Sequence, residues 1–232
     1  MTTMTTRDTT FLSIEGASAA IEAGTLSPVD LTQAVLDRIE ATDAQLNSYV
    51  LVMKDTALRE AEASAERART KSRLGPLDGI PMGIKDLYDT KDAITTGGTG
   101  AYRFRVPSED CTAVARLRAA GAVIIGKTNT HELAFGGTTN NVHYGPTRNP
   151  WHLDRVPGGS SGGSGSALAV GQALGALGTD TEAASATPHR TAASAASSRR
   201  TGCPRARGSP RCRTRSTTRG RWPARRTTAR SC

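Results

Sequence analysis

The sequence predicts a layered α/β fold for residues 10–181. Two segments in the first third of the chain show helical periodicity, with apolar side chains on one face and charged ones on the other. Two short apolar runs, IPMGIKD and AVIIG, are typical of buried strands. Because helical and strand signals alternate along the chain, we expect helices packed against a sheet.

The clearest helix is predicted where the segment SPVDLTQAVLDRIEATD begins at Ser27. Ser27 suits the N-cap, Pro28 fits the first helical position, and an aspartate follows three residues after the cap. The apolar positions Leu31, Val35 and Ile39 then fall on one face. A second, alanine-rich helix is predicted over DTALREAEASAERAR.

The strand signals come later in the chain. The run IPMGIKD predicts a strand whose end carries Lys85. Residues 108–129 predict a helix, a turn and a buried strand, with Ser108 as the helix cap and Gly121 at the helix end. Residues 157–180 predict a Gly/Ser loop, a helix of small residues and the start of a further strand or loop.

The net charge of +9 comes wholly from the last part of the chain. Residues 182–232 contain thirteen arginines and one glutamate, a charge of +12, which leaves −3 for residues 1–181. This tail contains no Leu, Ile, Val, Phe, Met or Tyr, so it cannot bury enough apolar surface to offset its ordering entropy. We expect residues 182–232 to be disordered, residues 10–181 to form the domain, and residues 1–9 to be a flexible N-terminus.

Cysteine usage and hydropathy predict a cytoplasmic protein. Cys111 is the only cysteine before residue 182, which argues against a disulfide framework. The three cysteines of the tail form no CxxC or CxxH pair, so no metal site is expected. The N-terminal segment has no signal-peptide apolar run, and no apolar run of the sequence is long enough to span a bilayer.

The Gly/Ser stretch PGGSSGGSGS, residues 157–166, allows three interpretations. A phosphate-binding P-loop needs a lysine after its last glycine, and this stretch has none. A flexible linker fits the composition, but the stretch stands between the ordered-looking TRNPWHLDRV and a predicted helix. The third interpretation is the loop of a serine hydrolase.

Six motifs carry a resemblance that favours the hydrolase. They are GIPMGIKDLYDT, TTGGT, GKTNTHELAFGG, YGPTRNPW, DRVPGGSSGGSGSALAVG and ALGTDT, in this order. In order and spacing the sequence resembles the amidase signature family. The resemblance implies an α/β/α domain with a mixed sheet flanked by helices, of which residues 10–181 would be the N-terminal, incomplete part.

The resemblance also implies a Ser–cis-Ser–Lys triad that hydrolyses amides. By position, Lys85 in GIKD corresponds to the general base. Ser160, the first serine of GGSSGG, corresponds to the bridging serine that follows a cis peptide bond. Without the motifs, Lys85 would be interpreted as a surface lysine beside Asp86, and Ser160 as a hydroxyl that caps the backbone.

The chemistry of amide hydrolysis supports these roles independently. An amide is a poor electrophile, so its hydrolysis favours an activated nucleophile and a stabilised oxyanion. A lysine acts as a base near neutral pH only where burial lowers its pKa. Lys85 follows the apolar run IPMGI, so burial is expected there.

The third member of the triad is missing from the sequence. The family continues GTDT as GTDTGGSIR, in which the serine is the nucleophile and the preceding backbone amides form the oxyanion hole. Here the oxyanion-hole region is Thr181, Glu182 and Ala183, and the nucleophile position is Ala184. The sequence therefore predicts a chain that is inactive as written.

A single lost base accounts for this departure. If the gene read ACC GGA GGC AGC ATC CGC, it would encode TGGSIR. Deleting one G of GGA then gives Thr-Glu-Ala-Ala-Ser-Ala, the sequence found from Thr181 onward. In the same restored frame, TAASAASSRR can yield CGIGGLKPT, close to the family's CGxxGLKPT. We interpret residues 182–232 as an out-of-frame tail.

The resulting functional hypothesis is an amidase-type hydrolase that acts on the C–N bond of small-molecule carboxamides. No metal or organic cofactor is implied, no membrane partner is expected, and the sequence does not indicate an oligomeric state. GIKDLYDT looks less like the glutamyl-tRNA amidotransferase A subunit than like a stand-alone amidase. The alternatives are an inactive scaffold and a polyanion binder that uses the arginines, although such nucleic-acid binding would be incidental because the tail has no folded platform.

Overall fold

The computed structural model describes residues 9–180. Residues 1–8 and 181–232 lie outside the described residues. The second range contains the tail that was predicted to be disordered, the predicted oxyanion-hole region and the nucleophile position Ala184.

Three helices form most of the first third of the described chain: α2 (Ile14–Glu22), α3 (Pro28–Leu46) and α4 (Lys54–Arg69). Helix α3 begins at its predicted cap, where Ser27 Oγ accepts a hydrogen bond of 3.2 Å from the amide of Val29. It ends where Asn47 adopts a left-handed conformation, with φ of 53°. Both predicted helices of this region are confirmed.

Four strands form a mixed sheet in the order β1 (Tyr49–Val52), β3 (Val123–Thr128), β2 (Pro81–Lys85) and β6 (Gly175–Leu177). Strand β1 runs antiparallel to β3, whereas β3, β2 and β6 are mutually parallel. The strands predicted from IPMGIKD and AVIIG are confirmed as β2 and β3. Because parallel strands end at the same edge of a sheet, Lys85 and the residues after β6 come together there.

Helix α5 (Thr112–Ala119) corrects one prediction. Its N-cap is Cys111, with no side-chain hydrogen bond, and not Ser108. The intervening residues pair with another loop instead of turning into the helix: Asp110 Oδ1 accepts from the amide of Lys91 at 2.7 Å, and the amide of Cys111 donates to Asp89 O at 2.9 Å. Tertiary contacts thus delay the helix start.

The remaining elements are short. Helix α6 (Gly162–Ala169) starts inside the Gly/Ser stretch. Two 3₁₀ turns, η1 (Gly100–Tyr102) and η2 (Glu132–Ala134), and a small hairpin of β4 (Asn140–Asn141) and β5 (Gly145–Pro146) lie in the loops.

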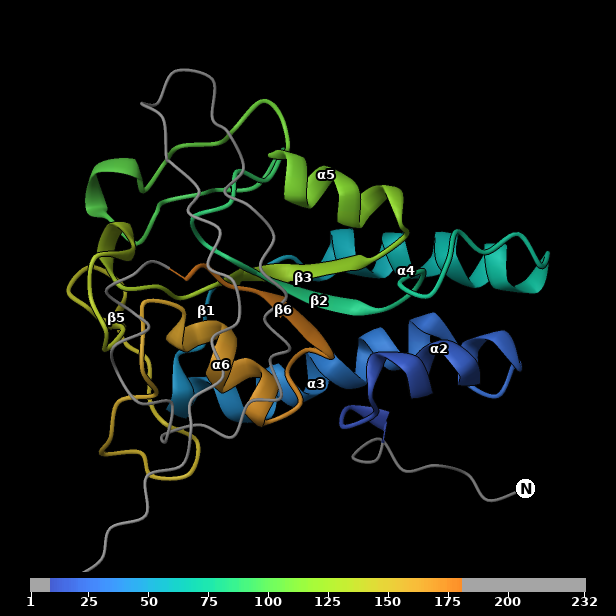
Figure 1. Ribbon diagram of the computed structural model, residues 1–232, viewed down its shortest axis with the longest axis horizontal. Helices are drawn as coiled ribbons and strands as arrows, with labels where there is room; N and C mark the ends of the chain where they lie inside the picture. The colour runs from blue at the N-terminus through green and yellow to red at the C-terminus, as the bar shows by residue number, and fades with distance from the viewer. Residues whose placement is uncertain (1–8, 181–232) are drawn as a thin grey trace, which may run out of the picture. The chain divides into compact units, whose positions relative to one another are not determined.

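Helices cover both faces of the four-stranded sheet, as the resemblance implied. In Figure 1, α5 and α6 lie on opposite sides of β2 and β3. Val114 of α5 belongs to one buried cluster with Ile124, while Ala167 of α6 belongs to another with Val123 and Ile125. Successive side chains of β3 therefore pack against different layers.

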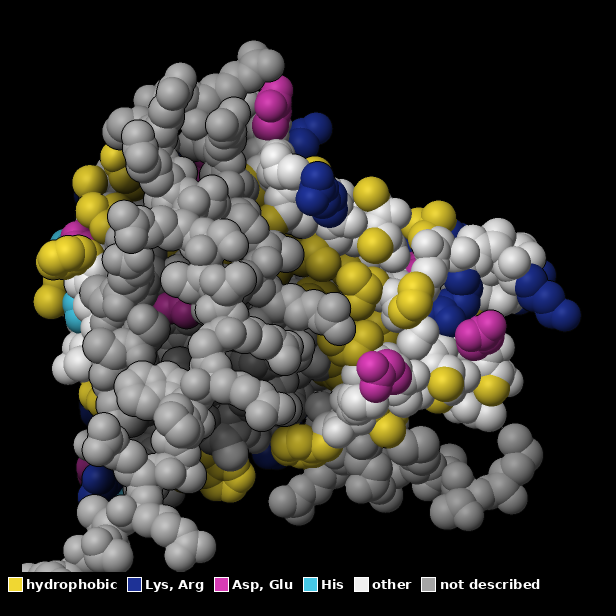
Figure 2. Space-filling model, viewed as in Figure 1, with side chains coloured by type: hydrophobic (Ala, Val, Ile, Leu, Met, Phe, Trp, Pro, Cys, Tyr) yellow, Lys and Arg dark blue, Asp and Glu magenta, His cyan; other side chains and the backbone are white. Residues whose placement is uncertain are grey.

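On the face that Figure 2 shows, hydrophobic and charged side chains of the described residues lie side by side. Among the large hydrophobic side chains left exposed are Phe104, Phe135 and Trp151, all of which lie in loops. Within residues 9–180, none of the helices combines the length and the hydropathy needed to cross a membrane.

Candidate active site

Lys85 lies at the end of β2 and is completely buried. Its Nζ donates three hydrogen bonds, to Ser160 Oγ at 2.7 Å, Ser161 Oγ at 2.8 Å and Thr179 Oγ1 at 2.7 Å. Three hydroxyl groups thus use every donor that a protonated lysine has. The structure brings together Lys85 and Ser160, the two residues selected from the sequence.

Ser160 is held by its backbone as well as by its side chain. The Gly159–Ser160 peptide bond is cis, as the resemblance implied. The carbonyl oxygen of Ser160 accepts hydrogen bonds from Thr130 Oγ1 at 2.9 Å and from the amide of His131 at 3.0 Å. The Gly/Ser stretch is therefore an ordered part of the fold and not a linker, and its second half forms α6.

Sequence reasoning missed two members of this cluster, Ser161 and Thr179. Ser161 Oγ accepts from the amide of Thr179 and donates to its carbonyl oxygen, both at 3.2 Å. These bonds tie the Gly/Ser loop to the segment after β6. Both residues stand inside the quoted motifs GGSSGG and GTDT, which was the available signal, but their contact depends on β6 pairing beside β2.

The electrostatic environment suits a base. Burial lowers the pKa of Lys85 to about 7, because the charged ammonium loses water that the hydroxyl groups replace only in part. An amine with this pKa exchanges protons near neutral pH with a hydroxyl at 2.7 Å. The arrangement can therefore relay a proton between Lys85 and Ser160.

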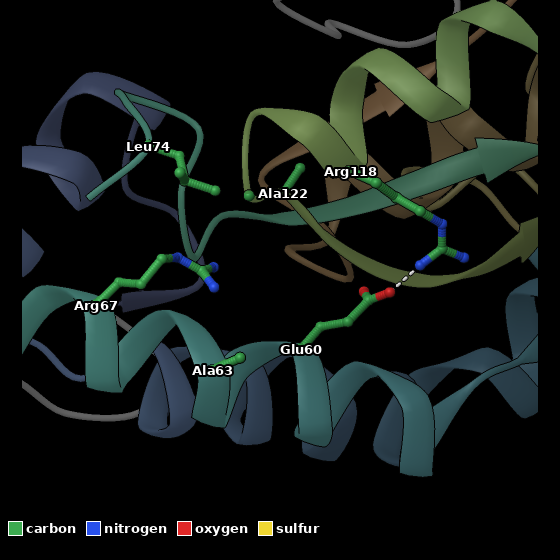
Figure 3. Close-up of a pocket in the computed structure, with 7 residues that line it drawn as sticks. Glu60, Ala63, Arg67, Leu74, Arg118 and Ala122 are labelled. Atoms are coloured by element: carbon green, nitrogen blue, oxygen red, sulfur yellow. Dashed lines mark hydrogen bonds and ion pairs between the residues drawn. The ribbon is translucent and has the colours of Figure 1, made fainter. Parts of the chain in front are cut away.

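Within the described residues, we considered two other kinds of functional site, a metal centre and the pocket of Figure 3. Among residues 9–180 no group of three or more His, Cys, Asp or Glu side chains could hold a metal ion. The pocket, of about 160 Å³, lies between α4 and the turn that precedes β3. Its arginines are already paired, Arg118 with Glu60 and Arg67 with Asp78, so they offer no free cation to a ligand.

Comparison with known proteins places these features in one family. A family model described as Amidase matches residues 30–188, which is more than half of the chain. The chain belongs to the amidase family. The chain therefore descends from amide hydrolases, which agrees with the resemblance of the six motifs.

The relatives of this amidase chain include glutamyl-tRNA(Gln) amidotransferase A subunits. The subunit of Thermobifida fusca (strain YX) is 48% identical over 170 residues, which cover 73% of this chain and 34% of that protein. The subunit of Streptomyces coelicolor is 45% identical over 164 residues, 71% of this chain and 33% of that protein. The chain thus spans about a third of the length of the curated relatives it matches.

Solved amidase structures share the fold. The peptide amidase of Stenotrophomonas maltophilia matches with a TM-score of 0.65 and 36% identity over 69% of this chain and 34% of that chain. A fatty acid amide hydrolase matches with a TM-score of 0.71 and 29% identity over 74% of this chain and 30% of that chain. The preference for a stand-alone amidase over an amidotransferase subunit stays a prediction.

The buried amine predicts a pH-dependent stability. The folded amidase chain releases the proton of Lys85 at a pH of about 7, whereas an unfolded lysine holds its proton to about 10.4. Between these values the unfolded state binds more protons, so the free energy of unfolding rises with pH. Urea unfolding should show the stability of the unchanged chain, relative to Lys85→Met, increasing by about 2 kcal/mol from pH 7 to pH 9. Lys91→Met, at an exposed lysine, corrects for the lost charge. An equal difference at both pH values would contradict the prediction.

Proposed function

We propose that this chain carries the proton-transfer half of an amide-hydrolysing site, with Lys85 as general base and Ser160 as the bridging serine. The observation that carries the proposal is the 2.7 Å hydrogen bond from Lys85 Nζ to Ser160 Oγ in a fully buried setting. In such a relay neutral Lys85 takes the proton of Ser160, and Ser160 takes the proton of the attacking hydroxyl. The leaving amine receives the proton by the reverse path.

The substrate class follows from the lineage. The proposed reaction converts a small-molecule carboxamide into a carboxylate and ammonia or an amine. The proton transfers proposed for Lys85 and Ser160 need neither a metal nor an organic cofactor. A cytoplasmic location is part of the proposal and rests on the single cysteine before residue 182.

The proposal includes inactivity of the chain as written. Ala184 has no hydroxyl group to attack a carbonyl carbon, and Ser185, one residue later, would be displaced from the reacting geometry. A displacement of even 1 Å can cost about a hundredfold in rate. Glu182 also puts a negative side chain in the predicted oxyanion-hole region of Thr181, Glu182 and Ala183. Preorganised donors, and not anions, stabilise the charge that develops there.

The proposed cause is the lost base at the Glu182 codon, which makes residues 182–232 an out-of-frame tail and residues 10–181 the amidase part. Re-sequencing the gene across the Thr181 codon tests this cause directly. Two results together would refute it: the new DNA sequence still encodes Thr-Glu-Ala-Ala, and the shifted frame does not encode the continuation of an amidase.

A direct assay of the chain tests the inactivity. Purified chain and its Ser160→Ala variant are incubated with a panel of simple amides, and ammonia release is measured. We expect both to match the rate without protein, because the attacking hydroxyl is absent. Release that is above this rate and survives Ser160→Ala would contradict the proposed mechanism; equal release at the blank rate supports it.

The relatives favour one second candidate, the A subunit of an amidotransferase. The curated relatives described above carry that name at 45–48% identity. Such a subunit would release ammonia from an amide donor and work with partner subunits. A preference of the frame-restored protein for glutamine over simple amides would favour this candidate over a stand-alone amidase.

A further inference from the structure

A second buried lysine lies on the opposite side of the sheet from the proposed relay. Lys127, in β3, and Asp86, which follows Lys85, are both completely buried and form an ion pair of 3.4 Å between Nζ and Oδ1. Asp86 continues the pairing of β2 with β3, since its amide donates to Thr128 O at 3.0 Å. Successive strand side chains point to opposite faces, so Lys85 and Asp86 point apart.

The three donors of Lys127 are all used, but on a loop and not on the carboxylate. Nζ donates to Tyr88 O at 2.6 Å, to Thr90 Oγ1 at 3.1 Å and to Thr95 Oγ1 at 2.6 Å. Lys127 therefore fixes both ends of the loop that leads from β2 to TTGGT. The negative charge of Asp86 compensates a cation that would otherwise be buried alone, at a high cost in free energy.

Asp86 holds the next part of the same loop. Its Oδ2 accepts hydrogen bonds from the amide of Thr96, at 3.0 Å, and from Thr96 Oγ1. Its carbonyl oxygen accepts from the amide of Gly97 at 2.8 Å. Thr96 Oγ1 in turn accepts from the amide of Gly98 at 2.9 Å. The turn of residues 96–98 is thus built around the Asp86 side chain.

The turn of residues 96–98 is connected to the segment that grips Ser160. Asn141 Nδ2 donates to Gly98 O at 2.7 Å and to Thr130 O at 2.9 Å, which joins the turn to Thr130. Thr130 Oγ1 and the amide of His131 then donate to the carbonyl oxygen of Ser160. An unbroken series of buried hydrogen bonds therefore runs from the ion pair to Ser160.

We propose that Asp86 and Lys127 are positioning residues, which hold the turn of residues 96–98 and the Thr130–His131 segment so that Ser160 Oγ stays in contact with Lys85 Nζ. The pair touches neither Ser160 nor a substrate, and it acts through the loops on the far side of the sheet. The inference rests on the proposed role of Lys85 and Ser160, and it assigns them the support that fixes their geometry.

The test compares Asp86→Asn with Asp78→Asn in the full chain. Asp78 is also completely buried and paired with an arginine, Arg67, at 2.7 Å, but it precedes β2 and has no bond in this series. Both variants remove the charge of a buried, ion-paired carboxylate, so both are expected to lower the melting temperature. Only Asp86→Asn is expected to change the Ser160 region.

Two readouts separate positioning from general stability. Hydrogen exchange of the His131 amide, which donates to Ser160 O, should accelerate at least about tenfold in Asp86→Asn and not in Asp78→Asn. The chain has only five lysines, so ¹³C-lysine NMR can follow Lys85. Its titration midpoint should rise by about one pH unit, a tenfold gain in proton affinity, because a loosened loop admits water. Loss of the Asp86 charge alone would lower the midpoint.

Each result decides one question. If His131 exchange, or the Lys85 midpoint, moves no more in Asp86→Asn than in Asp78→Asn, the positioning role is overturned. Should Asp86→Asn fail to fold, Thr96→Val removes one hydroxyl from the series and leaves the ion pair; a folded Thr96→Val chain with unchanged His131 exchange also overturns it. If Lys85 titrates near pH 10 in the chain without substitutions, the base role of Lys85 is contradicted. The hydrogen exchange of the His131 amide then decides the positioning role by itself.

Discussion

Inserting a single G at the Glu182 codon is expected to convert the chain, which we propose to be inactive, into the start of an active amidase. With the codons proposed above, the insertion restores Thr-Gly-Gly-Ser from Thr181 onward, so that a serine replaces Ala184 and glycines replace Glu182 and Ala183. A hydroxyl then stands where the family has its nucleophile, and two small residues leave the backbone amides free to bind an oxyanion. Ammonia release from a panel of amides, measured for both proteins, checks the change.

The matched controls keep the corrected frame and remove one member of the relay. Lys85→Met and Ser160→Ala should each reduce kcat by about 10²–10⁴-fold, the usual contribution of general acid–base catalysis. Ala184→Ser in the uncorrected frame should stay inactive, because Glu182 and the tail remain. If the corrected gene stops without a longer amidase sequence, or if its product hydrolyses amides equally well without Lys85, the proposal fails.

Local signals in the sequence predicted the elements that local interactions determine. The Ser27–Pro28 pair specifies the start of α3 through a hydrogen bond within one turn, and the structure keeps that start. Ser108 failed as a cap because Asp110 and Cys111 bond to residues 89–91, a contact that periodicity does not encode. The mixed α/β architecture was predictable, but the irregular loop starts were not.

The site shows the same division. Lys85 and Ser160 could be selected because the motifs carry them, and the structure places them in contact. Thr179 also stands in a quoted motif, but its contact with Lys85 could not be predicted, because its hydroxyl reaches the lysine only once β6 pairs with β2. Asp86 and Lys127 stand inside the quoted motifs GIPMGIKDLYDT and GKTNTHELAFGG, but nothing in either motif indicates that the two residues pair. Their burial is a property of the assembled sheet and loops.

Gly163→Ala, in helix α6, is expected to destabilise the fold strongly. A Cβ at Gly163 would lie 2.4 Å from Asn129 O, 2.5 Å from Asn129 N and 2.6 Å from Ser48 O. All three atoms are backbone, so no side chain can rotate away and the helix must move from the end of β3. Overpacking of this kind costs about 1–3 kcal/mol or more. For a domain of this size, a loss of 3 kcal/mol lowers the melting temperature by roughly 6–12 °C.

Gly165→Ala provides the control within the same helix. A Cβ at Gly165 meets no atom within 4 Å, so the new methyl group is accommodated without displacement. Replacing a helical glycine by alanine then stabilises by about 0.5–1 kcal/mol, because alanine loses less backbone entropy on folding. Thermal unfolding of both variants should therefore move in opposite directions. Equal shifts of the melting temperature would contradict the prediction. They would show that the absence of a side chain at Gly163 is not what lets α6, and with it Ser160, pack against the end of the sheet.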